Sequence, residues 1–426
     1  MYRLYSLLVP RLRLDAFHRD VLATFLTKII IAGFTLLALA LIGRRLGSEG
    51  KGLFELAILL PNMLGLLLGG GVYLANAYLV GRQQFDVATL TSHSISFTLI
   101  STALGIVIVT ILLLTGLLTR LMAGVPAPLL LVGTLLLPIQ LLGNAFQGIL
   151  QGKQKILRIN AVGLVRVFIF FLLVLFALLA LNGSASEMVL AFLLSYLIQT
   201  LVFARMVQQM GGQLRPRWQG NVVRKALGFG LRAQVGNILQ FYNYRLDVFI
   251  LNLFLGASSV GIYNVSVQFS ELLWFLPNAI GYVILPKAAA STKVEMDRFT
   301  PRIFLATLGI SAIAGVILAL IGHPLIVVLF GQDFSAAYLP LLALLPGVVL
   351  LGSAKVLMNE ITGRGYPQYN SITTGIALVV TVLLDLRLIP GLGLLGAAIA
   401  STCAYGLTWM ITIIFFQFIR YRSAAP

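Results

Sequence analysis

Ionisable and amide side chains interrupt one long apolar stretch of the sequence, Ala226 to Leu255. The stretch is long enough to cross a bilayer, since roughly 20 helical residues span a ~30 Å hydrocarbon core. A charge at membrane depth costs about 2.5–3.5 kcal/mol on insertion scales, so its charged residues must face protein or water. Polar residues recur at helical steps of three and four: Gln234, Asn237, Gln240, Tyr244 and Asp247. We interpret this helical face as part of the wall of a polar cavity.

Basic residues within the apolar segments predict a phosphate site, because the guanidinium fork binds phosphate oxygens in a bidentate manner. The residues predicted to hold a diphosphate are Arg245, Arg232, Lys355 and Arg166. Two alternatives stay open. Arg245 could pair with Glu271 and Lys355 with Glu360, which would only neutralise buried charge. Arg232 could instead extend to the cytoplasmic surface.

Amides and hydroxyls suit a sugar-binding wall, because they donate and accept hydrogen bonds without needing a counter-charge. The residues predicted to line such a wall are Asn237, Gln240, Asn243, Tyr244, Gln140, Asn144, Gln147, Asn264, Gln268 and Asn359. The alternative for any single amide is a bond between helices, worth roughly 0.6 kcal/mol.

Acidic residues in the apolar segments are candidates for coupling to protons or sodium ions, because buried carboxyl groups can change protonation as access changes. These candidates are Asp247, Glu271, Glu360 and Glu55. Tyr242, Tyr244, Tyr263 and Trp274 could stack on sugar rings, although aromatic residues in such segments are more often packing or interface residues.

The composition identifies a polytopic membrane protein, because 59% of the 426 residues are hydrophobic and only 10% are charged. The net charge of +17 comes from scattered basic residues, without a nucleic-acid-binding motif. The single Cys403 excludes an intrachain disulfide, and His93 and His323 have no metal-ligand partners at helical spacing. No Walker motif occurs, and the glycines near 65–71 follow no strand. We therefore expect no enzyme, cofactor or metal site.

Apolar segments predict twelve membrane-spanning helices and hence an all-α integral membrane fold. They fall at about 22–43, 53–79, 87–117, 126–150, 157–181, 187–209, 223–255, 259–286, 300–322, 338–361, 368–389 and 393–419. With both termini in the cytoplasm, most basic residues lie in inner segments, as the positive-inside rule requires. Only five fall in outer loops: Arg44, Arg45, Lys51, Arg120 and Arg387. We expect a multi-pass protein of a bacterial or archaeal cytoplasmic membrane.

The two halves of the chain resemble each other at a constant offset. Leu46-Gly47 corresponds to Leu255-Gly256, and Gly52 to Gly261, each 209 positions further on. An even number of helices per half gives both halves the same orientation, related by a pseudo-two-fold axis along the membrane normal. We therefore expect two six-helix lobes. The predicted parts are an N-terminal cytoplasmic arm (1–21), an N-lobe (22–209), a linker (210–222), a C-lobe (223–419) and a cytoplasmic tail (420–426).

The run NYRLDVFILNLFLGASSVGIYNVSVQFSELLWFLPNAIGYVILP resembles the flippases of the multidrug/oligosaccharidyl-lipid/polysaccharide superfamily, and most of all its polysaccharide-biosynthesis branch. The matching positions are Asn243, Arg245, Asp247, Leu255-Gly256, Val260-Gly261 and Tyr263. GRRLGSEGKGLFELA and QGILQGKQK resemble the corresponding signatures of the first lobe. The resemblance extends through both lobes. It implies a V-shaped transporter that moves an undecaprenyl-diphosphate-linked oligosaccharide from the inner to the outer leaflet. Twelve helices differ from the fourteen that are usual in the lipid II flippase branch.

We therefore expect a flippase for a lipid-diphosphate-linked oligosaccharide that works by alternating access, with a polyprenyl-diphosphate-linked saccharide and membrane lipids as partners. Proton or sodium coupling, a polysaccharide polymerase and glycosyltransferases are further expected partners. One alternative is a drug/cation antiporter of the same superfamily; the similar number of cations and acids in the apolar segments favours an anionic substrate instead. The other is a non-transporting membrane subunit of a polysaccharide-assembly complex.

Overall fold

The computed structural model describes the backbone of residues 2–422 and the side chains of 24–421 apart from 282, 286, 289, 290, 293 and 294. Within these residues the chain forms helices and turns, and no strand. The helices are α1 (Tyr2–Leu68), α2 (Val72–Gly81), α3 (Val87–Leu114), α4 (Leu117–Leu121), α5 (Ala127–Thr134), α6 (Leu136–Gly152), α7 (Ile156–Ala180), α8 (Ala185–Gln209), α9 (Gly220–Glu271), η1 (Leu272–Trp274), α10 (Phe275–Ala290), α11 (Lys293–Phe330), η2 (Gln332–Ala337), α12 (Tyr338–Gly363), α13 (Pro367–Leu392) and α14 (Leu394–Arg422).

Ten helical stretches of the described chain are long and apolar enough to cross a bilayer. Two of them, Thr24–Leu68 with 45 residues and Gly220–Leu285 with 66, are much longer than one crossing needs. The number of spans therefore depends on whether these two are divided. The all-α membrane fold and the multi-pass character predicted from the sequence are confirmed, while the count of twelve stays a prediction.

Two equivalent glycines interrupt the two long stretches. Gly47 in α1 has φ 68° and ψ −174°, and Gly256 in α9 has φ 80° and ψ 177°. Side chains with a Cβ rarely adopt this left-handed φ, so glycine is needed at both points. Because both breaks fall where the sequence predicts loops, 209 positions apart, the internal repeat is visible in the backbone.

A reciprocal contact joins the segments that follow these glycines. A Cβ on Gly52 would lie 1.7 Å from the carbonyl oxygen of Ala257, and a Cβ on Gly261 would lie 2.0 Å from that of Ser48. Ser48 and Ala257 are themselves equivalent in the repeat, so each half presents the same glycine to the same carbonyl of the other. Ser48 Oγ also lies 2.7 Å from Ser258 Oγ. The contact has local two-fold character, and only glycine lets the two backbones approach so closely.

Two predicted spans contain breaks that the apolar pattern does not indicate. The predicted segment 53–79 is interrupted between α1 and α2, where Gly70 and Gly71 have φ values of 55° and 69°. The predicted segment 259–286 passes through the 3₁₀ turn η1 before α10 begins. Periodicity cannot locate such breaks, because the flanking residues remain apolar on both sides.

The chain divides into two compact units. The first contains Met1–Leu39, Leu64–Ile108 and Leu131–Ala233, and the second contains Ala40–Met63, Val109–Leu130 and Gln234–Pro426. The segment 40–63 joins the second unit through the close contact at Gly52. The segment 109–130 joins it through Asn252, which donates to the Ala123 carbonyl at 3.2 Å. The division into lobes at residues 210–222 stays a prediction.

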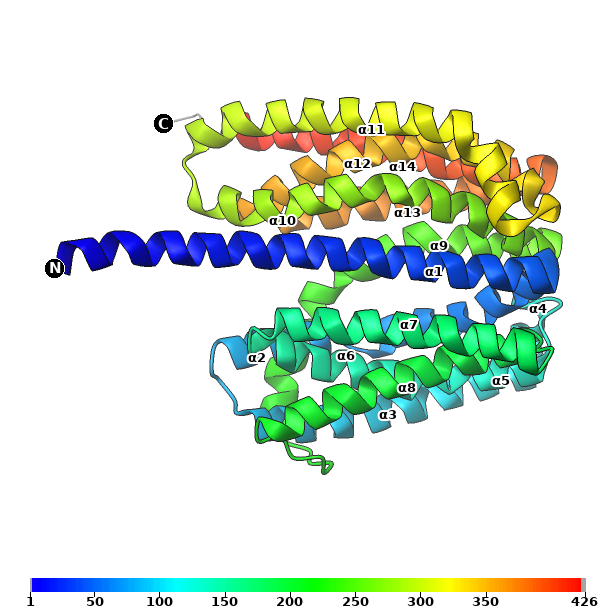
Figure 1. Cartoon of the computed structure of the whole chain (residues 1–426), viewed down its shortest axis with the longest axis horizontal. Helices are drawn as coiled ribbons and strands as arrows, with labels where there is room; N and C mark the ends of the chain where they lie inside the picture. Colours follow the sequence, from blue (N-terminus) through cyan, green and yellow to red (C-terminus); the bar gives the residue numbers. More distant parts are fainter. Residues whose placement is uncertain (1, 423–426) are drawn as a thin grey trace. The chain divides into compact units, whose positions relative to one another are not determined.

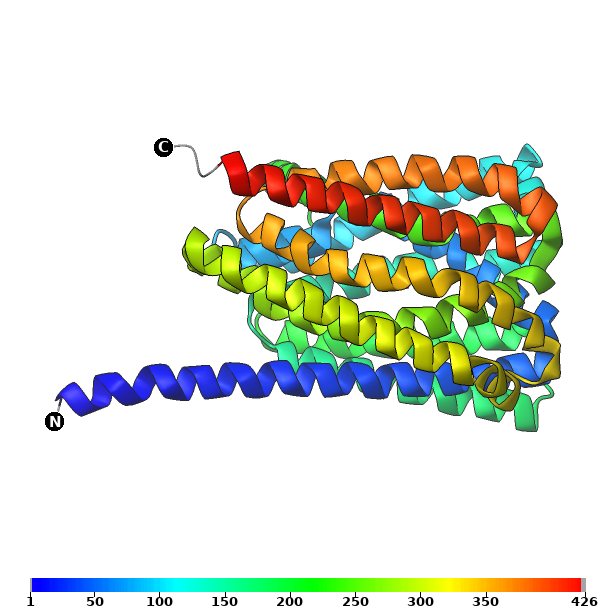
Figure 2. The same ribbon diagram turned by 90° about the horizontal axis from the view of Figure 1, so that it is seen from above.

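Each unit has its own helix packing. In the first unit α6 packs against α2 and α8, and α7 packs against α8. In the second unit α12 packs against α10, α11 and α14, and α13 packs against α14 (Figures 1 and 2). Most of the predicted site residues belong to this second unit.

The structure describes part of the predicted arm and part of the predicted tail. The backbone of α1 is helical from Tyr2 and continues without a break into the first apolar segment, as the long blue helix of Figure 2 shows. The predicted arm (1–21) is therefore helical from residue 2, while Met1 and the side chains of 2–21 lie outside the described residues. Of the predicted tail (420–426), residues 423–426 lie outside them as well.

Candidate functional site

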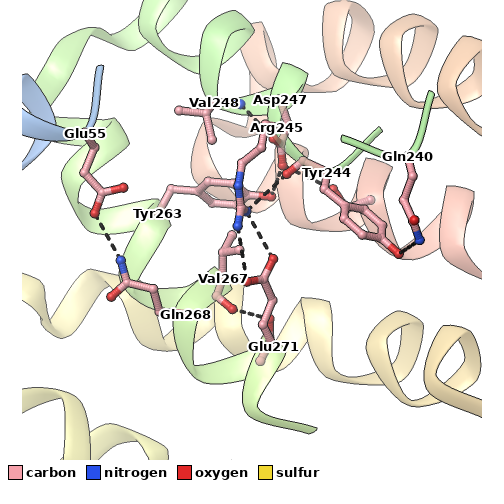
Figure 3. Close-up of polar contacts among 12 residues, drawn as sticks. Glu55, Gln240, Tyr244, Arg245, Asp247, Val248, Tyr263, Val267, Gln268 and Glu271 are labelled. Atoms are coloured by element: carbon pink, nitrogen blue, oxygen red, sulfur yellow. Dashed lines mark hydrogen bonds and ion pairs between the residues drawn. The ribbon is translucent and has the colours of Figure 1, made fainter. Parts of the chain in front are cut away.

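An ion pair in the second unit joins the two parts of α9. The Arg245 guanidinium contacts both carboxylate oxygens of Glu271: Nη2 donates to Oε2 at 3.2 Å, and Nη1 lies 3.1 Å from Oε1 (Figure 3). Both residues belong to α9, on either side of Gly256. Their side chains are 31% and 27% exposed, so the pair is accessible although half-buried. The pair between Arg245 and Glu271, which the sequence left open as an alternative to phosphate binding, is therefore present.

Three aromatic rings form a cluster beside this pair. The ring of Tyr244 lies 5.0 Å from that of Trp274 and 5.9 Å from that of Tyr405, centroid to centroid. Trp274 and Tyr405 are 6.0 Å apart. The cluster draws on α9, η1 and α14, and Gln240 fixes one ring by donating from Nε2 to the Tyr244 hydroxyl at 3.0 Å. Such rings offer flat apolar faces with polar edges.

Lys355 of α12 extends over this aromatic cluster. Its Nζ lies 3.7 Å from the centroid of Trp274 and 5.8 Å from that of Tyr244. It also lies 3.4 Å from Asn278 Oδ1. Among the described residues it makes no ion pair. The predicted alternative, a pair between Lys355 and Glu360, is wrong.

Asp247 is buried, with hydrogen-bond donors around its carboxylate. The Tyr263 hydroxyl donates to Oδ2 at 2.7 Å, and the Val248 amide donates to Oδ1 at 2.8 Å (Figure 3). Ser401 Oγ of α14 lies 3.4 Å from Oδ2. Its side chain makes no ion pair with a described residue. The structure thus keeps an acid in the interior that is solvated by neutral donors.

A second buried acid, Asp385 of α13, was missed by the sequence analysis. Thr381, one turn before it, donates to Asn243 Oδ1 of α9 at 2.8 Å, and Asn243 is one turn before Asp247. The two helices therefore face each other in register, and the carboxyl groups of Asp247 and Asp385 interact electrostatically. Asp385 is fully buried, and neither of its oxygens has a hydrogen-bond partner among the residues that the structure describes. A threonine followed after four residues by an acid in an apolar segment was the available signal.

Besides Glu271, two further predicted coupling acids have cationic partners. Glu55 pairs with Lys51, which is completely buried in α1, and accepts a hydrogen bond from Gln268 Nε2 at 3.0 Å. Lys51 lies in a helix and not in the predicted loop, because helix resumes directly after Gly47; its place on the outer side stays a prediction. Glu360 pairs with Arg364, one turn further along α12.

Arg364 belongs to a larger ionic group. Its Nη2 lies 2.9 Å from Asp297 Oδ1, and Arg420 Nε lies 3.5 Å from Asp297 Oδ2. The group links α11, α12 and α14 at one end of their bundle. Glu360 is thus engaged in a contact that neutralises charge and fastens helices.

The remaining predicted amides of the second unit do not form one continuous wall. Asn264 is buried, and Asn237 is exposed with Nδ2 3.4 Å from Gln234 Oε1. Asn359 donates from Nδ2 to the Lys355 carbonyl at 2.7 Å, within its own helix. Gln240 and Asn243 are the amides that lie against the aromatic cluster and the acids.

Five predicted site residues belong to the first unit. Arg166 of α7 lies over the ring of Tyr196, 4.3 Å from its centroid, and Arg232 is exposed on α9. On α6, Gln140 is buried, Gln147 half-buried and Asn144 exposed. A joint site of these residues with Arg245 and Lys355 stays a prediction.

Known proteins that are similar to this chain include flippases. The probable low-salt glycan biosynthesis flippase Agl15 of Haloferax volcanii is 23% identical over 244 residues, 55% of this chain and 50% of the relative. This chain spans about half the length of the curated relatives it matches, with 52% and 50% for the first two.

Solved structures share the fold. The lipid II flippase MurJ, in an inward closed conformation, superimposes with a TM-score of 0.77 at 15% identity, covering 93% of this chain and 87% of MurJ. An inward-facing multidrug resistance MATE family transporter of the MOP superfamily gives 0.73 at 14% identity, covering 91% and 94%. The described chain therefore has the fold of the MOP transporters.

A family model described as "Polysaccharide biosynthesis protein" matches residues 41–339, which include α9 with Arg245, Asp247 and Glu271. The match covers well over half of the chain and both of the equivalent glycine breaks. The chain is a member of this polysaccharide biosynthesis protein family.

Proposed function

We propose that the protein moves a lipid-diphosphate-linked oligosaccharide across the cytoplasmic membrane by alternating access. The observation that carries the proposal is Lys355, a half-buried cation in a membrane-spanning helix that makes no ion pair with a described residue. A cation in such a place is costly unless an anion reaches it. A substrate phosphate would supply that anion.

The neighbouring charges favour Lys355 over Arg245 as the principal phosphate ligand. Both carboxylate oxygens of Glu271 already engage the Arg245 guanidinium, so its charge is compensated within the protein. The Lys355 amine makes no ion pair with a described residue, and it is stabilised by the face of Trp274, a contact worth about 0.5–2 kcal/mol, and by the Glu271 carboxylate beyond ion-pair distance. The alternative is that Glu271 moves away when a diphosphate arrives, which would free Arg245 for bidentate binding.

The aromatic cluster provides a surface for the saccharide. Tyr244, Trp274 and Tyr405 lie within 6.0 Å of one another and adjoin Gln240, whose amide is engaged with a ring hydroxyl. Sugar rings have apolar faces that pack on aromatic rings, while their hydroxyls bond to amides and phenols. A phosphate ligand next to such a surface suits a sugar diphosphate better than a cationic drug.

The acid pair Asp247 and Asp385 is the candidate for ion coupling. Two facing carboxyl groups without a cationic partner in the described chain are accommodated when one is protonated or when a small cation lies between them. Glu55, Glu271 and Glu360 each have a basic partner already, which makes them less suited to this task. We also infer that glycosyltransferases build the saccharide at the inner leaflet and that a polymerase uses it at the outer one.

Reconstituted vesicles test the proposal. A polyprenyl-diphosphate saccharide is followed across the bilayer for the wild type, Lys355→Gln and Lys355→Arg. Lys287→Gln is the matched control, because Lys287 also lies over a ring, 3.6 Å from the centroid of Phe299. We expect little transport by Lys355→Gln, substantial transport by Lys355→Arg and normal transport by the control.

The same vesicles distinguish the alternatives. Transport of a fluorescent cationic compound in place of the lipid would identify a drug/cation antiporter. Transport of neither, by folded protein, would favour a non-transporting subunit. Wild-type transport by Lys355→Gln would refute the role given to Lys355.

A further inference from the structure

The first turns of α9, in the first unit, present a basic hollow. Val222 and Ala226 lie buried in the core of this unit, and Gly230 packs so closely that a Cβ would be 2.6 Å from the Gly70 carbonyl oxygen. These contacts fix which face of the helix remains free. That face lines an open hollow of about 580 Å³, formed by Arg224, Lys225, Gly228, Phe229, Arg232 and Ala233.

Gly228 forms the floor of the hollow. A side chain at this position would meet no other atom within 4 Å, so the space above it is open. Arg224 and Arg232 lie one turn before and one turn after it on the same helical stripe, about 12 Å apart along the axis. Their guanidinium groups can therefore approach one ligand from two sides.

Aromatic contacts hold the rim in place. Phe229 stacks on Tyr78 of α2, with ring centroids 4.3 Å apart and an interplanar angle of 11°. The Lys225 amine lies 5.2 Å from the centroid of Phe85, in the α2–α3 loop. The hollow is thus shaped by packing between segments far apart in the sequence.

The charges of the hollow have no anionic partner within the described chain. None of Arg224, Lys225 and Arg232 makes an ion pair with a described residue. All three side chains are exposed, so the hollow attracts an anion without having to release an internal carboxylate first. Three cations around one glycine floor match the phosphate group of a ligand.

The surroundings point to a lipid. Leu231, 51% exposed, follows the basic turns on a helix that belongs to a membrane-spanning stretch. Trp218, also 51% exposed, precedes them, as is typical of the membrane–water interface. A phospholipid whose phosphate lies above Gly228 could thus place an acyl chain along Leu231. The lining offers neither amide nor hydroxyl side chains, so nothing there would recognise a saccharide.

We propose that this hollow binds the phosphate headgroup of an anionic phospholipid of the bilayer. This hollow belongs to the first unit and Lys355 to the second, and the proposed ligand is not the transported substrate. Its ligand would hold the start of α9 at the interface, immediately before this helix passes into the second unit at Gln234. Transport would then require anionic lipid even where the substrate site is intact.

Lipid binding to the purified full chain tests the proposal. The protein is placed in nanodiscs of phosphatidylcholine that contain phosphatidylglycerol, and the lipids retained after dilution into detergent are counted by native mass spectrometry. A basic residue near an anionic membrane surface strengthens binding roughly fivefold, so three should give on the order of a hundredfold. We expect the triple variant R224Q/K225Q/R232Q to lose selective retention of phosphatidylglycerol by at least about tenfold.

A matched variant controls for general charge. K153Q/K155Q/R158Q removes the same number of exposed cations from the same unit, at the α6–α7 turn. We expect it to retain phosphatidylglycerol as the wild type does. Gly228→Leu keeps every charge but fills the hollow, so it should also reduce retention, and thermal unfolding verifies that each variant is folded.

Four results would overturn the proposal. They are equal losses in the two triple variants, wild-type retention by folded Gly228→Leu, displacement of the lipid by inorganic phosphate at equal concentration, and a preference for polyprenyl diphosphate over phosphatidylglycerol. The third would indicate a site for a soluble anion, and the fourth an entry site for the transported lipid.

Discussion

Removing Glu271 should destabilise the protein through Arg245, and a double-mutant cycle measures by how much. Arg245 Nη2 donates a hydrogen bond to Glu271 Oε2 at 3.2 Å, and Arg245 Nη1 lies 3.1 Å from Glu271 Oε1. A bond to a charged group contributes about 1.5–3 kcal/mol, and breaking a fully buried pair costs about 3–5 kcal/mol. Because the two side chains are 31% and 27% exposed, solvent screens part of this, and we expect a coupling of about 1–3 kcal/mol.

The assay compares the free energies of unfolding of the wild type, Arg245→Gln, Glu271→Gln and the double variant in detergent, followed by tryptophan fluorescence. Glu271→Gln leaves a half-buried cation without its partner, so it should be the less stable single variant in the absence of lipid. The double variant should be more stable than the sum of the two single changes predicts. Additivity within about 0.3–0.5 kcal/mol would refute the pairing as a stabilising interaction.

The same cycle separates the two roles of Arg245. If the arginine only neutralises Glu271, the double variant should transport nearly as well as the wild type. If a diphosphate displaces Glu271, Glu271→Gln should bind polyprenyl diphosphate more tightly than the wild type, and every variant without Arg245 should bind it more weakly. Unchanged lipid binding in all four proteins would exclude Arg245 as a phosphate ligand.

Three further outcomes follow from other parts of the structure. Gly52→Ala should cost at least about 1–3 kcal/mol of stability, because its Cβ would lie 1.7 Å from a carbonyl oxygen. Gly33→Ala, whose Cβ would have nothing within 4 Å, should be neutral or stabilising. Equal shifts of the unfolding temperature in the two variants would contradict the close crossing at Gly52. Asp385→Asn should make flipping insensitive to the imposed proton or sodium gradient while substrate binding persists, and an unchanged gradient dependence in vesicles would remove it from coupling. Hydrogen bonds from the Thr89 side chain and amide lower the pKa of Asp86, so its stabilisation of α3 is present above the pKa of an unfolded aspartate, about 4, and is lost as the pH falls through the lower folded value. The unfolding temperatures of wild type and Asp86→Asn should therefore converge in acid, and a constant difference would contradict this.

The apolar segments of the sequence determined the membrane-spanning character and most helix positions. Their length leaves few options, since each must bury its backbone polar groups in hydrogen bonds of its own helix. α7, α8, α12, α13 and α14 begin and end within a few residues of the predicted bounds. The repeat was also readable, because Gly47 and Gly256 mark positions where only glycine adopts the required backbone.

The breaks inside helices were not readable from the sequence. Gly70 and Gly71 end α1 in the middle of a predicted span, because the chain there must pass close to Gly230 of α9. A glycine in an apolar run is compatible with continuous helix, with a kink or with a close crossing. The choice depends on what packs against it, which is a property of the whole fold.

Charge pairing was decided by tertiary structure alone. Helical spacing left Arg245 free to bind phosphate or Glu271, which lies 26 residues further on, beyond the Gly256 break. The same spacing allowed a pair between Lys355 and Glu360. In the structure Glu360 pairs instead with Arg364, four residues further along the helix. Periodicity places a residue on a face of its helix, and the neighbouring helix determines what that face meets.

For Asp385 too, the sequence determines the residue type and the tertiary structure determines its surroundings. The sequence places an acid near the end of an apolar segment, where it could equally face water. Only the packing of α13 against α9, recorded in the bond from Thr381 to Asn243, turns it toward Asp247 and buries it completely. The sequence by itself determined that charges enter the membrane, because apolar length and residue type suffice for that. Which charges compensate one another, and which remain available for a ligand, was decided by contacts between helices far apart in the chain.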